Sequence, residues 1–156
     1  MEPTRPSPAT GNDTDQLRLG AQLCFALYST LLGVNKVYRG LLRDLDLTYP
    51  QYLVMLVLWE KDAVNVSEIC DKLHLETTTL TPLLKRLEAR GLVDRRRSSQ
   101  DERQVIVTLT AEGRALREKA APIPGCVAAA SGLSIDEIVD LRGKLFGLRA
   151  NLFAAR

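Results

Sequence analysis

One segment, between Asn65 and Leu109, limits the possible folds more than any other part of the sequence. It begins with a capped stretch that predicts a short helix, continues through a turn into an amphipathic helix, and ends in two β-type runs around a polar tip. Leucines occupy the i, i+3, i+4 and i+7 positions of the second helix, as one buried face requires. The order helix, turn, helix and hairpin predicts a winged helix-turn-helix. The expected elements are a helix at residues 66–73, a turn at 74–77, a helix that Gly91 ends, and strands at 92–96 and 104–109.

Helical patterns account for most of the remaining chain. Leucines and valines at helical spacing predict one long helix over residues 17–45, and Pro50 is suited to open a second, almost wholly apolar helix that ends near Lys61. Pro82 lies inside the amphipathic helix, so that helix is expected either to start late or to have a distorted first turn. After the hairpin we expect a helix at residues 110–121, an interruption at 122–125 and a final helix capped by Ser134.

The length of 156 residues suits a single domain with one core. We expect this domain to be mainly α with a small β-wing and to span residues 16–155. Residues 1–15 are polar and proline-rich, which predicts a disordered tail. Within the domain, residues 50–109 form the expected DNA-binding lobe, and residues 16–46 and 110–155 supply helices outside it.

Several function classes have no support in the sequence. Three widely separated cysteines and one histidine give neither metal-ligand spacing nor a disulfide framework, and no Gly-rich phosphate loop is present, so neither a metal nor a cofactor is expected. The first residues contain no hydrophobic signal region. The strongest apolar stretch, residues 53–59, is about a third of the length that spans a bilayer. A cytoplasmic protein without a membrane partner is therefore expected.

The positive charge of the chain is concentrated in one segment. The whole chain has a formal net charge of +2, whereas residues 85–103 contain seven cations against four anions. A concentrated basic segment suits a surface that faces phosphates. On charge alone, a solvated charged face is an equally good interpretation.

The amphipathic helix also has the side chains that a DNA-reading helix needs. Opposite its leucines it presents short polar and cationic groups, and hydroxyls near a helix N-terminus can contact phosphates or base edges. Arg97 and Arg103 flank the hairpin tip, where guanidinium groups can enter a narrow minor groove. The residues of the helix expected to face DNA are Thr77, Thr78, Thr79, Thr81, Lys85 and Arg86.

Three stretches resemble the multiple-antibiotic-resistance regulator (MarR) family. They are TLTPLLKRLE at residues 79–88, RGLV at 90–93 and DERQVIVTLT at 101–110. The resemblance implies an obligate homodimer, held by the N- and C-terminal helices and bound to palindromic double-stranded operator DNA. It also implies that Asp101 braces Arg103, which enters the minor groove.

Cys24 lies on an apolar helical stretch with tyrosines at suggestive spacing. At ~100° per residue, Tyr28 shares the helix face of Cys24, and Tyr38 returns to within about 40° of that face. Because Cys24 and Tyr38 are ~21 Å apart along such a helix, they can meet only if two copies of it pack antiparallel. Tyr49 can join the same pocket. Phenol hydroxyls aimed at a sulfur stabilise the thiolate, which is the form that peroxides attack.

A narrower resemblance concerns the organic-hydroperoxide-responsive repressors within that family. It rests on QLCFALY at residues 22–28, on Tyr38 and on YPQYL at residues 49–53. It implies that Cys24 is the peroxidatic cysteine and that Tyr38 and Tyr49 of the partner subunit hold its thiolate. It further implies that Cys126 is a resolving cysteine that forms an intersubunit disulfide with Cys24. Cys70, among apolar positions, is expected to be a core residue.

The expected function is therefore a dimeric DNA-binding repressor that senses organic hydroperoxides through Cys24 and releases DNA after disulfide formation with Cys126. One alternative is a MarR-type regulator that responds to a small phenolic ligand and in which Cys24 is unreactive. That view agrees with the general tendency of cysteines on apolar helix faces to be core residues. A thiol peroxidase is a third possibility, but an enzyme of that kind has no use for a recognition helix and a wing, so no enzymatic activity is expected.

Overall fold

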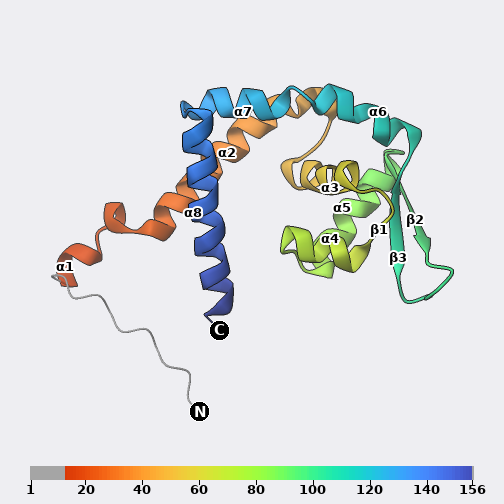
Figure 1. Cartoon of the computed structure of the whole chain (residues 1–156), viewed down its shortest axis with the longest axis horizontal. Helices are drawn as coiled ribbons and strands as arrows, with labels where there is room; N and C mark the ends of the chain where they lie inside the picture. Colours follow the sequence, from red (N-terminus) through yellow and green to blue (C-terminus); the bar gives the residue numbers. More distant parts are fainter. Residues whose placement is uncertain (1–12, 156) are drawn as a thin grey trace, which may run out of the picture. The chain divides into compact units, whose positions relative to one another are not determined.

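The computed structural model describes residues 13–155 and is mainly helical, with one small sheet (Figure 1). The chain divides into two compact units, Met1–Lys36 and Val37–Arg156. Of the tail expected at residues 1–15, residues 1–12 lie outside the described residues, and residues 13–15 belong to a short helix, α1 (Asp13–Gln16). The first unit also contains the 3-10 turn η1 (Leu19–Ala21) and the first part of α2 (Leu23–Leu41).

The single helix expected over residues 17–45 is wrong in its extent. Gln22 has an extended backbone, and its side-chain amide donates to the carbonyl oxygens of Gln16 and Arg18, which separates η1 from α2. At the other end a second 3-10 turn, η2 (Arg43–Leu45), closes on Asp46 in the left-handed conformation. Helical periodicity therefore identified the helix, whereas local side-chain hydrogen bonds and one left-handed residue set its ends.

The second unit contains the expected helix-turn-helix and wing. The short helix and the two strands of the hairpin lie within one residue of their expected positions. One strand is additional, because two residues before the short helix pair with the hairpin in an antiparallel sheet of order β1-β3-β2. The elements are α3 (Tyr49–Glu60), β1 (Val64–Asn65), α4 (Val66–Leu73), α5 (Thr77–Ala89), β2 (Val93–Arg97), β3 (Val105–Leu109), α6 (Ala111–Ala120), α7 (Ile123–Ser131) and α8 (Ile135–Ala154).

The core lies beneath α5 and around α3. Leu80, Leu83, Leu84 and Leu87 are all buried, which confirms the leucine face of the amphipathic helix. This helix begins at Thr77 and runs through Pro82, so the late start allowed by the sequence does not occur. The proline deprives a helix carbonyl in the first turns of its usual N–H partner. The burial of the four leucines holds the helix in place despite this missing hydrogen bond.

The root of the wing is tied to the helices by polar contacts. The carboxylate of Asp62 accepts from the backbone N–H of Leu109 at 2.8 Å and pairs with Arg114 at 2.8 Å. The indole of Trp59 donates to the carbonyl oxygen of Gly113 at 2.9 Å. These contacts join the end of β3 and the start of α6 to the helical part of the unit, so the hairpin has a fixed base.

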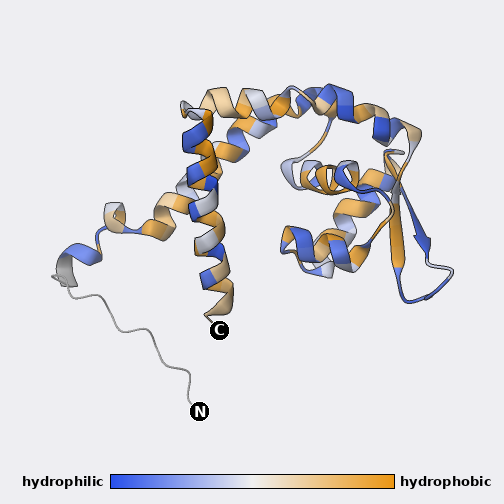
Figure 2. Cartoon of the chain, in the orientation of Figure 1, coloured by the Kyte–Doolittle hydropathy of each residue, from blue (hydrophilic) through white to orange (hydrophobic). Residues whose placement is uncertain are grey.

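Several helices leave their apolar side chains exposed. Neither α2 nor α8 contains a buried residue, and Figure 2 shows apolar positions along the length of α8. Within residues 13–155 no helix is both long and apolar enough to cross a membrane. Exposed apolar side chains that recur along whole helices are typical of a surface that another protein chain covers. The large ones on α8 are Ile135, Val139, Leu141, Leu145, Phe146, Leu152 and Phe153.

Candidate functional site

The residues expected to face DNA lie on the exposed side of α5. Its first turn presents three consecutive hydroxyls, and one turn before its end it presents two cations. Thr81 differs from the others, because it is partly buried and its hydroxyl donates to the carbonyl oxygen of Thr77 at 2.8 Å. The hydroxyl of Thr81 therefore supports the first turn of the helix. The exposed members of the set are Thr77, Thr78, Thr79, Lys85 and Arg86.

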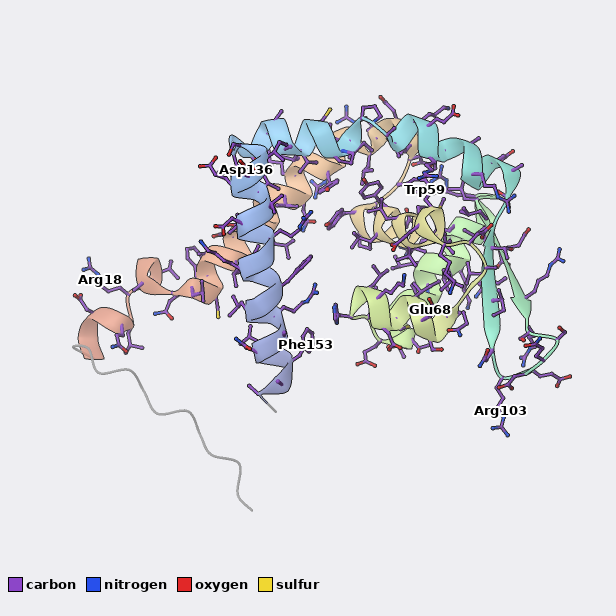
Figure 3. The ribbon with its side chains drawn as sticks, in the orientation of Figure 1. Arg18, Trp59, Glu68, Arg103, Asp136 and Phe153 are labelled. Carbon is purple, nitrogen blue, oxygen red and sulfur yellow. The ribbon has the colours of Figure 1, made fainter. Side chains whose placement is uncertain are left out.

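The hairpin tip presents Arg103 to solvent on a well-defined turn. Asp101 accepts through its carboxylate from the backbone N–H of Arg103 at 3.0 Å, and Arg97 donates to the carbonyl oxygen of Glu102 at 3.0 Å. Figure 3 shows Arg103 at the tip of the hairpin, directed away from the helices. Asp101 thus holds the main chain from which the Arg103 side chain projects.

An ion pair fixes the hairpin to α5, the helix expected to face DNA. Arg95 on β2 donates from two nitrogens to one carboxylate oxygen of Glu88 on α5, at 3.0 and 2.7 Å. The hydrogen bonds from Arg95 lower the pKa of the Glu88 carboxyl. The wing and α5 therefore keep a defined relation, which a surface that contacts two grooves requires.

Three tyrosines form a cluster where α2 ends and α3 begins. The rings of Tyr38 and Tyr49 are stacked with centroids 4.3 Å apart, and Tyr52 lies 5.6 Å from Tyr38 and 6.4 Å from Tyr49. The sequence had suggested that Tyr38 and Tyr49 can share a pocket, and the structure brings the two rings together. It had assigned no role to Tyr52, although its spacing of three from Tyr49 puts both on one helix face.

The environment of the cluster keeps its phenols protonated. Burial, followed by the neighbouring Tyr49 and Tyr52, raises the pKa of Tyr38 to about 12. Burial likewise raises the pKa of Tyr49, and burial and Tyr49 raise that of Tyr52. A protonated phenol is a hydrogen-bond donor, so the cluster offers O–H groups and no negative charge near neutral pH.

The three cysteines differ in their surroundings. Cys24 and Tyr28 lie in the first unit and are exposed, with Tyr28 at 62%. Cys70 is buried at the junction of the helix-turn-helix, with its sulfur 3.8 Å from the hydroxyl of Thr77, which confirms its expected place in the core. Cys126 is exposed on α7. Two of the three thiols are thus open to solvent in the protomer.

Cys126 does not share the face of α7 that approaches Tyr38. An apolar cleft of about 370 Å³ is lined by Tyr38, by residues of α8 and by Pro124, Val127 and Ala128 of α7. Cys126 lies midway in sequence between Pro124 and Ala128, and is therefore about 160° round the helix from both. A disulfide to Cys126 consequently requires either an approach to the outer face of α7 or a rotation of that helix. In the part of the chain that the structure covers, no group of three or more His, Cys, Asp or Glu side chains is placed to hold a metal ion.

Comparisons with known proteins agree with this arrangement. A family model described as transcriptional regulator SarA/Rot matches residues 36–120. The chain is 43% identical over 141 residues to the organic hydroperoxide resistance transcriptional regulator of Bacillus subtilis, covering 90% of this chain and 96% of that protein. It is 48% identical over 145 residues to the HTH-type transcriptional regulator TtmR of Methylorubrum extorquens, covering 93% of this chain and 74% of that protein.

Solved structures of AbfR of Staphylococcus epidermidis are also similar. The structure of reduced AbfR bound to DNA has a TM-score of 0.75 and 37% identity, with 91% of this chain and 99% of that chain covered. The structure of disulfide-formed AbfR has a TM-score of 0.60 and 35% identity, with 91% and 94% covered. These matches therefore extend over about nine-tenths of this chain.

Proposed function

This chain belongs to the family of MarR- and SarA/Rot-type transcriptional regulators, and on that premise we propose that it is a dimeric repressor that senses organic hydroperoxides through Cys24. Family membership makes it a DNA-binding regulator and not a peroxidase. We place its action in the cytoplasm, where its operator DNA lies. The observation that carries the proposal is the stacked pair of protonated phenols, Tyr38 and Tyr49.

The dimer is the element that completes the sensing site. Cys24 and Tyr38 are separated by fourteen residues of α2, so the tyrosine cluster of one copy serves the thiol of the other. The exposed apolar faces of α2 and α8 support this assembly, because a second copy that covers them would remove them from solvent. In this proposal residues 16–46 and 110–155 form the dimer, and residues 50–109 form the DNA-binding lobe.

The first chemical step is the reaction of a hydroperoxide with Cys24. Phenol O–H groups from the partner's Tyr38 and the partner's Tyr49 donate to the sulfur and favour its thiolate over its thiol. The thiolate attacks the outer oxygen of the hydroperoxide and the O–O bond breaks. Cys24 becomes a sulfenic acid, and the other oxygen leaves as an alcohol after taking a proton from solvent. Tyr28, on the same face of α2 as Cys24, lines this pocket.

The second step joins the two subunits covalently. The thiol of Cys126 in the partner attacks the sulfenic sulfur of Cys24, a disulfide forms, and water leaves. Because Cys126 faces away from the cleft beside Tyr38, we propose that α7 turns as this bond forms, rather than that the partner thiol approaches the outer face of α7. Only two residues separate the end of α6 from the start of α7, and α6 is hydrogen-bonded through Gly113 to the indole of Trp59. A turn of α7 is thereby transmitted to the base of the wing and releases DNA. A cellular thiol reductant reverses the disulfide.

The reduced dimer binds palindromic DNA through two copies of one surface. The hydroxyls and cations on the exposed side of α5 enter the major groove, and Arg103 at the wing tip enters the neighbouring minor groove. The carboxylate of Asp101 accepts a hydrogen bond from the backbone N–H of Arg103 and so keeps Arg103 in position.

Oxidation of matched cysteine variants tests the proposal. Wild type, Cys24→Ser and Cys126→Ser are treated with cumene hydroperoxide, then separated by non-reducing electrophoresis and assayed by fluorescence anisotropy on an operator duplex selected with the reduced protein. We expect a crosslinked dimer and operator release only in the wild type. A Cys24→Ser protein that still leaves DNA on treatment would remove the thiol mechanism and favour a small phenolic effector. A monomer band in every lane would remove the role of Cys126.

A further inference from the structure

The second unit has a basic cleft that neither the thiol site nor the wing explains. Its volume is about 660 Å³, and it lies where the end of α2, η2, the start of α3 and the end of α5 meet. Four of its lining residues are arginines, and a single acid accompanies them. We call this feature the basic cleft. Its charged residues are Arg39, Arg43, Arg86, Arg90 and Asp46.

Within residues 13–155, one of the four arginines is neutralised by an acidic side chain. Arg90 pairs with the carboxylate of Asp46 at 3.5 Å, and it donates to the carbonyl oxygens of Leu45, at 3.1 Å, and of Asp46. Among the residues that the structure describes, Arg39, Arg43 and Arg86 have no ion-pair partner. Three unpaired guanidinium groups around one cleft repel each other, and an anion bound between them relieves that repulsion.

The start of α3 adds to the positive potential of the cleft. Thr48 and Gln51 line the cleft and cap each other, since each side chain bonds the other residue's backbone N–H. The first turn of this 12-residue helix is the positive end of its macrodipole. Because the capping groups already bond each other, they are not free to bind an anion. The helix therefore contributes positive electrostatic potential to the cleft, and the arginines contribute the hydrogen-bond donors.

Arg86 connects the basic cleft to the proposed DNA surface. Thr79 and Arg86 are seven residues apart on α5, which puts them within about 20° of one helix face. Both are exposed, and Arg86 also lines the cleft. The cleft therefore continues the exposed side of the reading helix towards Arg39 and Arg43.

We propose that the basic cleft binds a phosphate group, and that its source is the backbone of the bound DNA, beyond the bases reached by α5. Guanidinium groups match phosphate oxygens with two parallel hydrogen bonds. Contacts of this kind position a protein on the duplex without reading sequence. The inference rests on the proposed DNA-binding function and extends its contact surface to Arg39 and Arg43, which lie outside the helix-turn-helix and the wing.

The salt dependence of DNA binding tests the cleft separately from the recognition residues. Full-length wild type and Arg39→Gln/Arg43→Gln are titrated by fluorescence anisotropy onto the selected operator duplex and onto an unrelated duplex, at several salt concentrations. If each lost arginine contacts one phosphate, the slope of log K against log[salt] becomes shallower by about 1.8 per engaged protomer. Affinity for both duplexes falls by about tenfold or more at low salt, while the preference for the operator is kept. Lys119→Gln/Lys144→Gln, which loses two positive charges from α6 and α8, should keep the wild-type slope.

A second arm uses inorganic phosphate without DNA. Thermal unfolding is followed in phosphate and in chloride at equal ionic strength. An increase in Tm with phosphate that is seen in wild type and absent in Arg39→Gln/Arg43→Gln shows that the cleft also takes free phosphate. A double variant with the wild-type slope, the wild-type affinity and the wild-type response to phosphate overturns the inference. Failure of the wild type to bind any duplex would instead overturn the proposed function, and the phosphate arm would still test the cleft.

Discussion

Trp59 and Gly113 are joined by a hydrogen bond of 2.9 Å, from the indole Nε1 to the backbone carbonyl oxygen, although 54 residues separate them in sequence. Figure 3 places Trp59 on α3, below the helices that follow the wing. The indole also meets Tyr52 edge-on at 6.3 Å, and Tyr52 lies beside Tyr38. Continuous contacts therefore connect the tyrosine cluster to the first turn of α6 at the root of the wing.

Substitution of Trp59 by phenylalanine should separate oxidation from DNA release. The N–H is lost together with part of the aromatic surface, so the free energy of unfolding should fall by at least the contribution of one hydrogen bond, about 0.5–1.5 kcal/mol. We expect sulfenic acid to form on Cys24 at the wild-type rate, measured with a sulfenic-acid probe. Operator affinity after oxidation should fall less than in the wild type. Equal operator release by the two proteins would show that coupling does not pass through this contact.

Gly113 should not tolerate a side chain. A Cβ at this position would overlap the carbonyl oxygen of Leu92 and press on the side chain of Leu109. Gly113→Ala must therefore displace either the wing root or α6, at a cost of about 1–3 kcal/mol, which urea denaturation measures. Gly40→Ala is the matched control, because nothing lies within 4 Å of its added Cβ. That change should stabilise α2 by up to about 1 kcal/mol. Equal effects of the two substitutions would contradict the close packing at Gly113.

The parts of the structure that were predictable from sequence depend on local patterns. The leucine face of α5, the capped helix α4 and the alternating strand β3 each follow from residues close together in the chain. The two-residue strand β1 was missed because its pairing of Val64 with Val107 is a contact over long sequence separation. Residue spacing likewise suggested a pocket shared by Tyr38 and Tyr49. Tyr52, Trp59 and the basic cleft required tertiary structure, since they join residues from several elements.

Stability in acid should depend on Asp62. Burial alone raises the pKa of the Asp62 carboxyl, but hydrogen bonds from Leu109, Arg114 and Ala63 outweigh it, and the resulting pKa lies below the usual 3.8. A lowered pKa means that the ionised group adds stability above pH 3.8, and that this stability is lost as the pH falls through the folded-state pKa. Asp62→Ala should cost about 1–3 kcal/mol at neutral pH, since it leaves the Leu109 N–H unpaired, and the cost should shrink in acid.

The control for Asp62 is an exposed ion pair. Asp140→Asn removes the partner of Lys144 on α8 and should cost no more than about 1 kcal/mol. Urea denaturation at pH 7 and in acid compares the two variants. A cost for Asp62→Ala that stays constant across this range would contradict a native-state role for the ionised carboxylate.

Stability in alkali should depend on Tyr38. Burial and the adjacent phenols raise its pKa from 10.0 to about 12, so the folded state favours the neutral phenol. The associated stability is complete below pH 10.0 and is lost as the pH rises towards about 12. Denaturation at pH 9 and pH 11 should therefore show a larger loss in wild type than in Tyr38→Phe, and tyrosinate absorbance should report the late titration directly. If Tyr38 instead ionised with the ordinary tyrosine pKa of 10.0, that result would contradict the buried, clustered environment.

The apolar surroundings of Cys24 predict which oxidants should react fastest with this proposed sensing thiol. Leu23 and Phe25 flank it and are partly or largely exposed, so an organic hydroperoxide can bury its apolar group against them while hydrogen peroxide cannot. Burial of one phenyl-sized group contributes about 1.5–3 kcal/mol, which corresponds to a rate advantage of about tenfold or more if the contact is made in the transition state. Stopped-flow oxidation of the Cys126→Ser protein by cumene hydroperoxide and by hydrogen peroxide measures this ratio without disulfide formation. Phe25→Ser should reduce the ratio mainly by slowing the cumene hydroperoxide reaction. Equal rates for the two oxidants in the parent protein would show that apolar contacts do not select the signal.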